Sequence, residues 1–456
     1  MKRVFSFFRS RRLIFKLCCI MLLAQLFFAC NKPDHFPIPG NNDVSKYSSE
    51  VIDKWITMQI RLMKNATGIA NVLFCRYYAY TGITAYEAIA PGTSIGTSIN
   101  AKLNGLSNLP SANHFKKYYW PASENAALAS INRSIFANAS IADKAAIDSL
   151  ENALNTSYAS ETSAEVLTLS NTFGKGVADA VYNWSATDGI IHVSDAYTPP
   201  LGPGLWVPTP PGFRKASTPY FGNLRTLISG DIDNTQPGPP LAYSEVPGSP
   251  FYLMAKLNYD VSQNLTGDQI AQALFWRDIP GVTTGGHWES ILQQVLKQTR
   301  SHLDKAAFAY ALTGICNHDP SVSCFQTKYN YNLVRPITYI RNVLGHTTWS
   351  SLLTTPPHPE YSSVHAVLSS ATSDALEVLF GNIGSFTDHT YDYLGFAPRN
   401  FSSFRAIGED AGNSRLYAGI HYQPSIDTGL LQGRKVAANI FRKLGVHFDD
   451  DKKGEQ

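Results

Sequence analysis

Apolar residues recur every three to four positions along most of the chain, which is the pattern of amphipathic helices. The stretch 48–66, for example, places Val51, Trp55 and Met63 near one stripe. Ser or Asp stands at plausible starts of such segments, and Gly or Asn at plausible stops. Because strand patterns are sparse, we expect an all-α protein built as a large helical bundle, or as two packed bundles. Further helical segments are expected at 71–90, 123–139, 141–158, 163–186, 265–278, 288–300 and 303–316, with helices continuing to about residue 444.

The periodic pattern is interrupted between about residues 187 and 250. Stretches such as "YTPPLGPGLWVPTPPGF" are rich in Pro and Gly and cannot hold regular helix. The aromatic residues Trp206, Phe213 and Tyr220 favour a loop that wraps over the core, not a free linker. The chain is therefore divided into an N-terminal helical region (47–186), a wrapping loop (187–250), a C-terminal helical region (251–445) and a polar tail (446–456).

The N-terminus has the composition of a targeting segment. Residues 1–29 contain six basic residues and no acid, and they end in the apolar run "LCCIMLLAQLFFAC". This is typical of a signal peptide, and Ala29 followed by Cys30 resembles a lipoprotein cleavage site. An ordinary signal peptide or an uncleaved anchor is the alternative. With lipidation at Cys30 and a tether over 30–46, we expect an exported protein held on a bacterial membrane, in the periplasm or at the cell surface.

Charge and cysteine content limit the remaining classes. Removing six of the 38 basic residues leaves 32 against 35 acidic residues, a net charge of −3, which offers no basic excess for nucleic acid. Beyond Cys30, Cys316 and Cys324 are the only pair of cysteines close in sequence, and an exported protein can oxidise them to a disulfide. A zinc site is the weaker alternative, because only His318 lies nearby. Cys75 lies in an apolar segment and is expected to be a buried thiol.

Three motifs carry candidate chemistry. The first, "KYNYNLVRP", places Lys328 and Arg335 seven residues apart, hence on one face of a helix that Pro336 ends near the arginine. A solvated basic stripe is the alternative. The apolar and aromatic neighbours and the absence of an acid in this segment instead favour two buried cations that need an anion.

The second motif is "SSVH". Ser362 or Ser363 is expected to cap the helix that follows. Capping alone would explain the pattern. The alternative is an anion site, in which Ser363 and the Val364 amide are donors and His365 transfers a proton.

The third motif, "NSRLYAGIHYQPSID", contains Arg415 and His421 on one expected helical segment that Pro424 stops. A helix C-terminus would favour the charged form of His421. Asp427 is close enough in sequence to orient its ring. A core histidine is the alternative for His421 taken alone.

Together the motifs supply one Lys, two Arg, a Ser hydroxyl, helix-start amides and two His. This set suits a tetrahedral oxyanion, with donors for its oxygens, one histidine to attack the central atom and another on the opposite side.

The order of the motifs resembles the signature of the type 2 phosphatidic acid phosphatase and vanadium-dependent haloperoxidase superfamily. The signature residues fall between 328 and 429, and "PPHPEY", "SRLYAGIHY" and "FWRDIPGVTTGGHW" resemble the haloperoxidase branch. The resemblance implies that His365 is the general acid–base and that His421 ligates vanadium, or is the nucleophile of a phosphatase. It also implies an oxyanion site, for vanadate or phosphate, in which Lys328 additionally polarises bound peroxide; this site comprises Lys328, Arg335, Ser363, Val364 and Arg415.

Two positions depart from the family pattern. Val364 stands where glycine is usual, which keeps the amide but narrows the approach of an anion. Ser425 stands where an acid usually follows the second histidine, so either Ser425 or Asp427 would have to orient His421. His287 and His358 are expected either to line the site or to be structural.

Three functions remain open at this point. The first is a vanadate-dependent haloperoxidase that oxidises halide with hydrogen peroxide. The second is an exported acid phosphatase that hydrolyses phosphate monoesters through a phosphohistidine and needs no cofactor. The third is a non-catalytic surface lipoprotein on the same fold. Small-molecule substrates, a membrane contact only through the lipid anchor, and no nucleic acid are the expected partners.

Overall fold

The computed structural model describes residues 43–93, 98–279, 282 and 284–447. Over these ranges the expected all-α class is confirmed, because the strands form only one short antiparallel pair. The elements are α2 (Glu50–Asn65), α3 (Leu73–Glu87), α4 (Trp120–Ile135), α5 (Ile141–Tyr158), α6 (Ala164–Ser185), α7 (Pro250–Gln263), α8 (Gly267–Phe275), α9 (Thr284–Thr299), α10 (Leu303–Tyr331), α11 (Pro336–Asn342), α12 (Val364–Phe380), β1 (Phe386–Asp388), β2 (Arg399–Phe401), α13 (Phe404–Tyr417) and α14 (Gln423–Leu444).

Side-chain caps fix several helix starts. Ser140, Ser163 and Ser249 accept hydrogen bonds from first-turn amides of α5, α6 and α7. At α8, Thr266 and Gln269 form a reciprocal capping box. Ser163 is a start that the sequence pattern indicated, whereas α7 with its cap Ser249 lies where no helical segment was expected.

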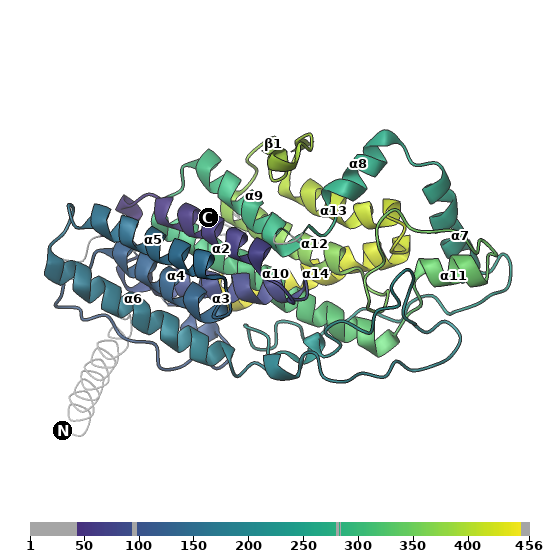
Figure 1. Ribbon diagram of the computed structural model, residues 1–456, viewed down its shortest axis with the longest axis horizontal. Helices are drawn as coiled ribbons and strands as arrows, with labels where there is room; N and C mark the ends of the chain where they lie inside the picture. Colours follow the sequence, from purple (N-terminus) through teal and green to yellow (C-terminus); the bar gives the residue numbers. More distant parts are fainter. Residues whose placement is uncertain (1–42, 94–97, 280–281, 283, 448–456) are drawn as a thin grey trace, which may run out of the picture. The chain divides into compact units, whose positions relative to one another are not determined.

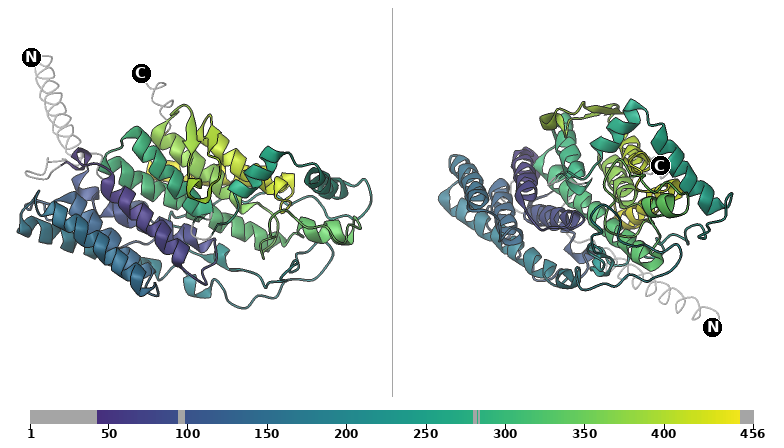
Figure 2. Two further views of the ribbon diagram at one scale, coloured as in Figure 1. Left: turned by 45° about the horizontal axis from the view of Figure 1, so that its top comes forward. Right: turned by 45° about the vertical axis from the view of Figure 1, so that its right-hand side comes forward.

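Helix α10 is the central element of the described fold (Figure 1). It packs against α3 on one side and against α12 and α14 on another, while α4 packs against α5 and α6. Two further views show the N-terminal helices gathered beside the C-terminal ones (Figure 2). A Cβ on Gly82 would lie 2.5 Å from the carbonyl oxygen of Tyr310, so glycine permits the close approach of α3 to α10.

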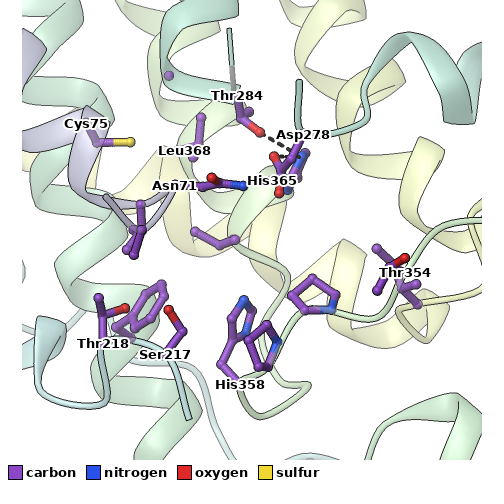
Figure 3. Close-up of a pocket in the computed structure, with 18 of the residues that line it drawn as sticks. Asn71, Cys75, Ser217, Thr218, Asp278, Thr284, Thr354, His358, His365 and Leu368 are labelled. Atoms are coloured by element: carbon purple, nitrogen blue, oxygen red, sulfur yellow. Dashed lines mark hydrogen bonds and ion pairs between the residues drawn. The ribbon is translucent and has the colours of Figure 1, made fainter. Parts of the chain in front are cut away.

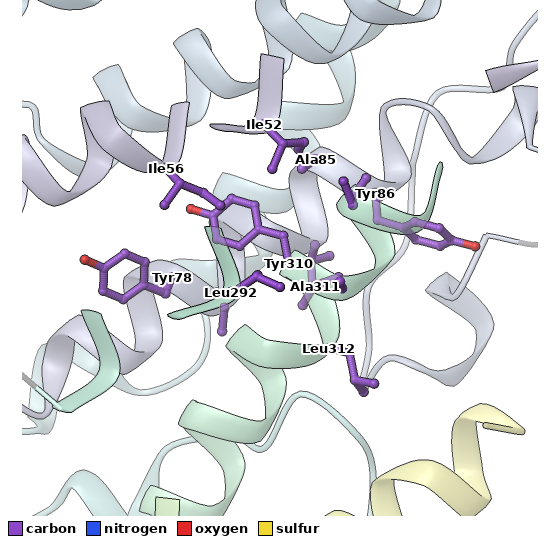
Figure 4. Close-up of a cluster of buried hydrophobic side chains, with 14 of the residues drawn as sticks. Ile52, Ile56, Tyr78, Ala85, Tyr86, Leu292, Tyr310, Ala311 and Leu312 are labelled. Atoms are coloured by element: carbon purple, nitrogen blue, oxygen red, sulfur yellow. The ribbon is translucent and has the colours of Figure 1, made fainter. Parts of the chain in front are cut away.

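The junction of α2, α3, α9 and α10 is a core of apolar and aromatic side chains (Figure 4). Ile56, Tyr78, Leu292 and Tyr310 are all fully buried there. Burying each aliphatic side chain of this kind stabilises the fold by about 1.5–3 kcal/mol.

The segment between α6 and α7 contains no α-helix, only 3₁₀ turns at Ile190–His192 and Phe221–Asn223. It is nevertheless tied to the helices. Trp206 is fully buried, and its amide donates to the carbonyl of Asn332 at 2.7 Å. The Asp319 carboxylate of α10 accepts from the amides of Leu227 and Ile228. A buried carboxylate thus replaces the strand or helix partners that these amides lack.

The expected disulfide between Cys316 and Cys324 is wrong, since both are buried free thiols. Both lie in α10, which runs through Pro320 instead of stopping near Cys316. Eight residues of helix separate the two Cα atoms by about 12 Å, too far for a disulfide. Pro320 leaves the carbonyl of Cys316 without its helical donor, and the hydroxyl of Thr372 donates to it at 3.3 Å.

No helix of the described residues has the length and hydropathy needed to span a bilayer. The expected signal peptide and Cys30 lie outside the described residues. No cluster of three or more metal-ligating His, Cys, Asp or Glu side chains occurs within the described ranges, and the zinc alternative near His318 finds no support there.

Candidate functional site

Lys328 and Arg335 do not share a helix. α10 ends at Tyr331, because Asn332 takes a left-handed conformation (φ 46°), and Arg335 is the extended residue that precedes α11. The prediction that both cations lie on one helical face is therefore wrong. Both side chains are fully buried, so the solvated-stripe alternative is excluded.

Backbone carbonyls hold these two cations. The Nζ of Lys328 donates to the carbonyls of Pro359 and Glu360, at 3.0 and 2.9 Å. Arg335 donates to the carbonyls of His358 and Ile420, each at 2.8 Å. Burial lowers the pKa of Lys328 to about 7 and that of Arg335 to about 10.

The second motif forms the start of α12. Ser363 is the N-cap residue, but its hydroxyl makes no capping bond and is buried with no hydrogen-bond partner among the residues that the structure describes. The hydroxyl of Ser362 donates instead to Gln432 at 2.6 Å. The expectation that either serine side chain caps the helix is wrong. Because buried hydroxyls are normally satisfied, Ser363 is a donor in need of a ligand.

Val364 occupies the first position of α12 and packs its side chain on two apolar clusters. Its amide belongs to the first turn, where a helix offers no internal partner. The backbone of Val364 is helical, so this position does not require glycine. Valine therefore presents the same first-turn amide that glycine would.

His365 lies one residue further along α12, almost buried. Its Nε2 is 2.6 Å from the hydroxyl of Thr284 and 3.5 Å from the carboxylate of Asp278. Burial, helped by the positive charge of Arg415, lowers its pKa well below the ordinary value. The ring is therefore neutral at physiological pH.

Arg415 lies on a helix, as expected, but in the last turn of α13, which ends before His421, so the two residues do not share one helical segment. Its guanidinium donates to the carbonyl of Trp276 at 2.8 Å and to the hydroxyl of Ser414 at 3.0 Å. Burial lowers its pKa to about 10, while the charge of Asp278 opposes this effect.

His421 does not end a helix. α13 ends at Tyr417, and Pro424 stands in the first turn of α14, where proline is well tolerated. His421 therefore precedes a helix N-terminus, and the expected charge-stabilising macrodipole is wrong. Burial, with the nearby charges of Arg335 and Lys328, lowers its pKa well below the ordinary value.

The ring of His421 is oriented by Glu360, a residue that the sequence reasoning missed. Its Oε1 is 2.8 Å from Nδ1 of His421 and also accepts the amide of Tyr422 at 3.0 Å. When Glu360 is ionised it can only accept, and Nδ1 of His421 then carries the proton. The lone pair is then on Nε2, which lies 3.3 Å from Arg335.

The two candidates for orienting His421 have other partners. Ser425 donates to the second oxygen of Glu360 at 2.6 Å, so it supports the carboxylate and not the ring. Asp427 is exposed and accepts from Gln423 at 2.8 Å. Burial raises the pKa of Glu360, opposed by the Ser425 hydroxyl and by the charges of Arg335 and Lys328. Sequence spacing favoured nearby acids, whereas Glu360 lies 61 residues before the ring.

Part of the predicted set opens on a pocket of about 450 Å³, in whose wall His365 and His358 lie (Figure 3). Lys328, Arg335, Ser363 and His421 are not among its lining residues. His358, Val364, His365 and Arg415 line it. His358 also approaches Arg335, with 2.9 Å between its Nδ1 and the guanidinium. His287 is structural, because it is buried, paired with Asp388 at 2.6 Å and stacked on Trp276.

Comparison with known proteins agrees with this geometry. Residues 308–450 match the family model described as the VCPO second helical-bundle domain. The crystal structure of a bacterial vanadium-dependent iodoperoxidase is similar, with 30% identity, a TM-score of 0.80, and coverage of 89% of this chain and 98% of that one.

Holo and apo crystal structures of a bacterial vanadium-dependent chloroperoxidase share the fold, each with 16% identity and a TM-score of 0.63. They cover 84% and 82% of this chain, and 96% and 94% of their own. No curated protein matches. The likeness to the iodoperoxidase establishes that the chain belongs to the vanadium-dependent haloperoxidase family.

Proposed function

We propose that the protein is a vanadate-dependent haloperoxidase that oxidises halide with hydrogen peroxide. The observation that carries this proposal is a buried set of oxyanion donors, one of which, Arg335, lies 3.3 Å from Nε2 of His421, within a chain of the haloperoxidase family. The overall reaction is X⁻ + H₂O₂ + H⁺ → HOX + H₂O, in which the O–O bond breaks and the halide loses two electrons.

The residues present fit vanadate. Lys328, Arg335 and Arg415 have backbone carbonyls as partners, which satisfy hydrogen bonds without neutralising their charge. The orphaned hydroxyl of Ser363 and the Val364 amide complete the donors. Nε2 of His421 supplies the ligand atom, because a metal-ligating histidine usually donates its other ring N–H to a carboxylate. When bound, vanadate supplies the Lewis-acid chemistry that activates peroxide.

His365 is placed to handle protons. As a neutral ring it accepts a proton from peroxide, and it returns one to the oxygen that leaves as water. Thr284 and Asp278 hold its Nε2 at the pocket wall. Lys328, Arg335 and Arg415 stabilise the negative charge that develops on the reacting oxygens.

A paired assay tests the proposal. Purified protein is given either peroxide with bromide or iodide and a phenolic dye, or a phosphate monoester, with and without vanadate. Halogenation that requires vanadate and is lost in His421→Ala supports the haloperoxidase. If ester hydrolysis occurs and vanadate only inhibits it, the protein is a phosphatase. The absence of both reactions in protein shown to bind vanadate overturns the proposal.

We further propose that the enzyme is exported and lipid-anchored through Cys30, on the basis of the N-terminal sequence. Cells fed a radiolabelled fatty acid should label the full chain, and Cys30→Ser should abolish the label. Label retained on the Cys30→Ser variant would contradict the anchor.

A further inference from the structure

Two arginines that line the pocket are more exposed to solvent than the oxyanion donors. Arg214 comes from the loop between α6 and α7 and is exposed, and Arg277, between α8 and α9, is half-buried. Arg415, in contrast, is 2% exposed. The guanidinium of Arg277 lies 5.1 Å from the ring centre of Phe396, which holds it at this level of the pocket. These exposures place Arg214 and Arg277 at the mouth, outside the donor set.

The inner groups alone do not attract a halide once vanadate is bound. Three cations, Lys328, Arg335 and Arg415, face two carboxylates, Asp278 and Glu360, so with all five groups ionised the inner site has one net positive charge. Bound vanadate adds negative charge, which has to be counted in the electrostatic potential of the site. The occupied site is then neutral or negative toward an incoming anion.

We propose that Arg214 and Arg277 form an anion-steering entrance that draws halide into the occupied site. This inference rests on the proposed function. Asp278 is the one acidic side chain among the described residues lining the pocket, so the mouth keeps a net positive charge. A cleft lined by one sign of charge raises the local concentration and the on-rate of the opposite ion, by tenfold or more at low salt. Hydrogen peroxide is neutral and gains nothing from it.

The test compares the pair variant Arg214→Gln/Arg277→Gln with Arg300→Gln. Arg300 is an exposed arginine outside the pocket lining and serves as the matched loss of one guanidinium. Thermal unfolding of all variants checks that each is folded. At about 10 mM ionic strength, kcat/KM for iodide should fall about three- to tenfold in the pair variant and remain unchanged in Arg300→Gln. The value for peroxide should be unchanged in both, and the difference should vanish at about 1 M salt, where the Debye length is about 3 Å.

A second measurement does not depend on turnover. Stopped-flow association of vanadate with the vanadate-free protein should slow by a similar factor in the pair variant at low salt. If halide turnover is absent in every variant, the proposed function fails. The association rate of vanadate still tests whether Arg214 and Arg277 steer anions into the pocket. Unchanged vanadate association together with an unchanged salt dependence for iodide would overturn the inference. So would an equal loss in kcat/KM for peroxide and for iodide.

Discussion

Glu360 links the protonation of His421 to the affinity for vanadate. The carboxylate accepts hydrogen bonds from Nδ1 of His421, the amide of Tyr422 and the hydroxyl of Ser425, at 2.8, 3.0 and 2.6 Å. In Glu360→Gln the amide oxygen still accepts the first two, and the amide nitrogen can donate to Ser425. The substitution therefore keeps the geometry and removes the negative charge behind the ring.

Losing that charge makes Nε2 a weaker ligand. Partners of this kind are worth about 10- to 100-fold in metal affinity, and the shape-conserving change should fall at the lower end, about tenfold or about 1.4 kcal/mol. Removing a buried negative charge also favours any anion in the site. Sulfate, which does not coordinate histidine, should therefore bind Glu360→Gln as tightly as before or more tightly.

Calorimetric titration of vanadate and sulfate measures both effects. Asp427→Asn is the matched control, because this acid is closer in sequence to His421 but is exposed and bonded to Gln423. We expect it to change neither affinity. The reasoning is refuted if Glu360→Gln weakens sulfate and vanadate equally, or if only Asp427→Asn weakens vanadate.

Three further predictions concern the donors. Ser363→Ala should leave the midpoint of thermal unfolding of the vanadate-free protein unchanged or raised, because the buried hydroxyl has no partner among the described residues. Calorimetry should show that the same variant binds sulfate about tenfold more weakly. A lower unfolding midpoint would indicate that the hydroxyl is structural instead. Val364→Gly should lower the free energy of unfolding in urea by about 1–2 kcal/mol and leave the affinity for sulfate unchanged. If the variant binds sulfate more tightly, the valine side chain obstructs the anion. Sulfate affinity should be constant below pH 7 and fall as the pH rises above it, up to about tenfold per unit, because the protonated form of Lys328, with its pKa of about 7, binds the anion. Lys328→Arg should remove this pH dependence. If the affinity of that variant still falls steeply, a group other than Lys328 titrates.

Helical periodicity predicted most of the elements, because amphipathic faces are local properties of the sequence. Segment 141–158, for instance, coincides with α5. The main difference is α10, whose expected segment ended at residue 316 whereas the helix continues through Pro320 to Tyr331. The cost of this proline is offset by Thr372, a donor from another helix, and no local pattern contains that information.

The site shows the same division. The residue types and order of the three motifs carry the donor set, since its members are close in sequence within each motif. The conformations between them were not predictable, because the ends of α10 and α13 depend on backbone turns at Asn332 and Gly419. Glu360 was missed for a related reason. Its role requires a contact between segments 61 residues apart, and an acid in a Pro-rich stretch has no periodic signal.

The segment between α6 and α7 contributes to the wall of the pocket but not to the set of oxyanion donors. The helices from α10 onward hold the oxyanion donors, whereas Arg214, Ser217 and Thr218 reach the same pocket from a segment without regular structure. The carboxylate of Asp319 holds that segment through the backbone amides of Leu227 and Ile228, so these two anchors do not depend on the side chains of the segment. Substitutions at Arg214, Ser217 and Thr218 can thus change the wall of the pocket while the helices that hold the oxyanion donors stay as they are, which makes these positions a starting point for engineering access to the site.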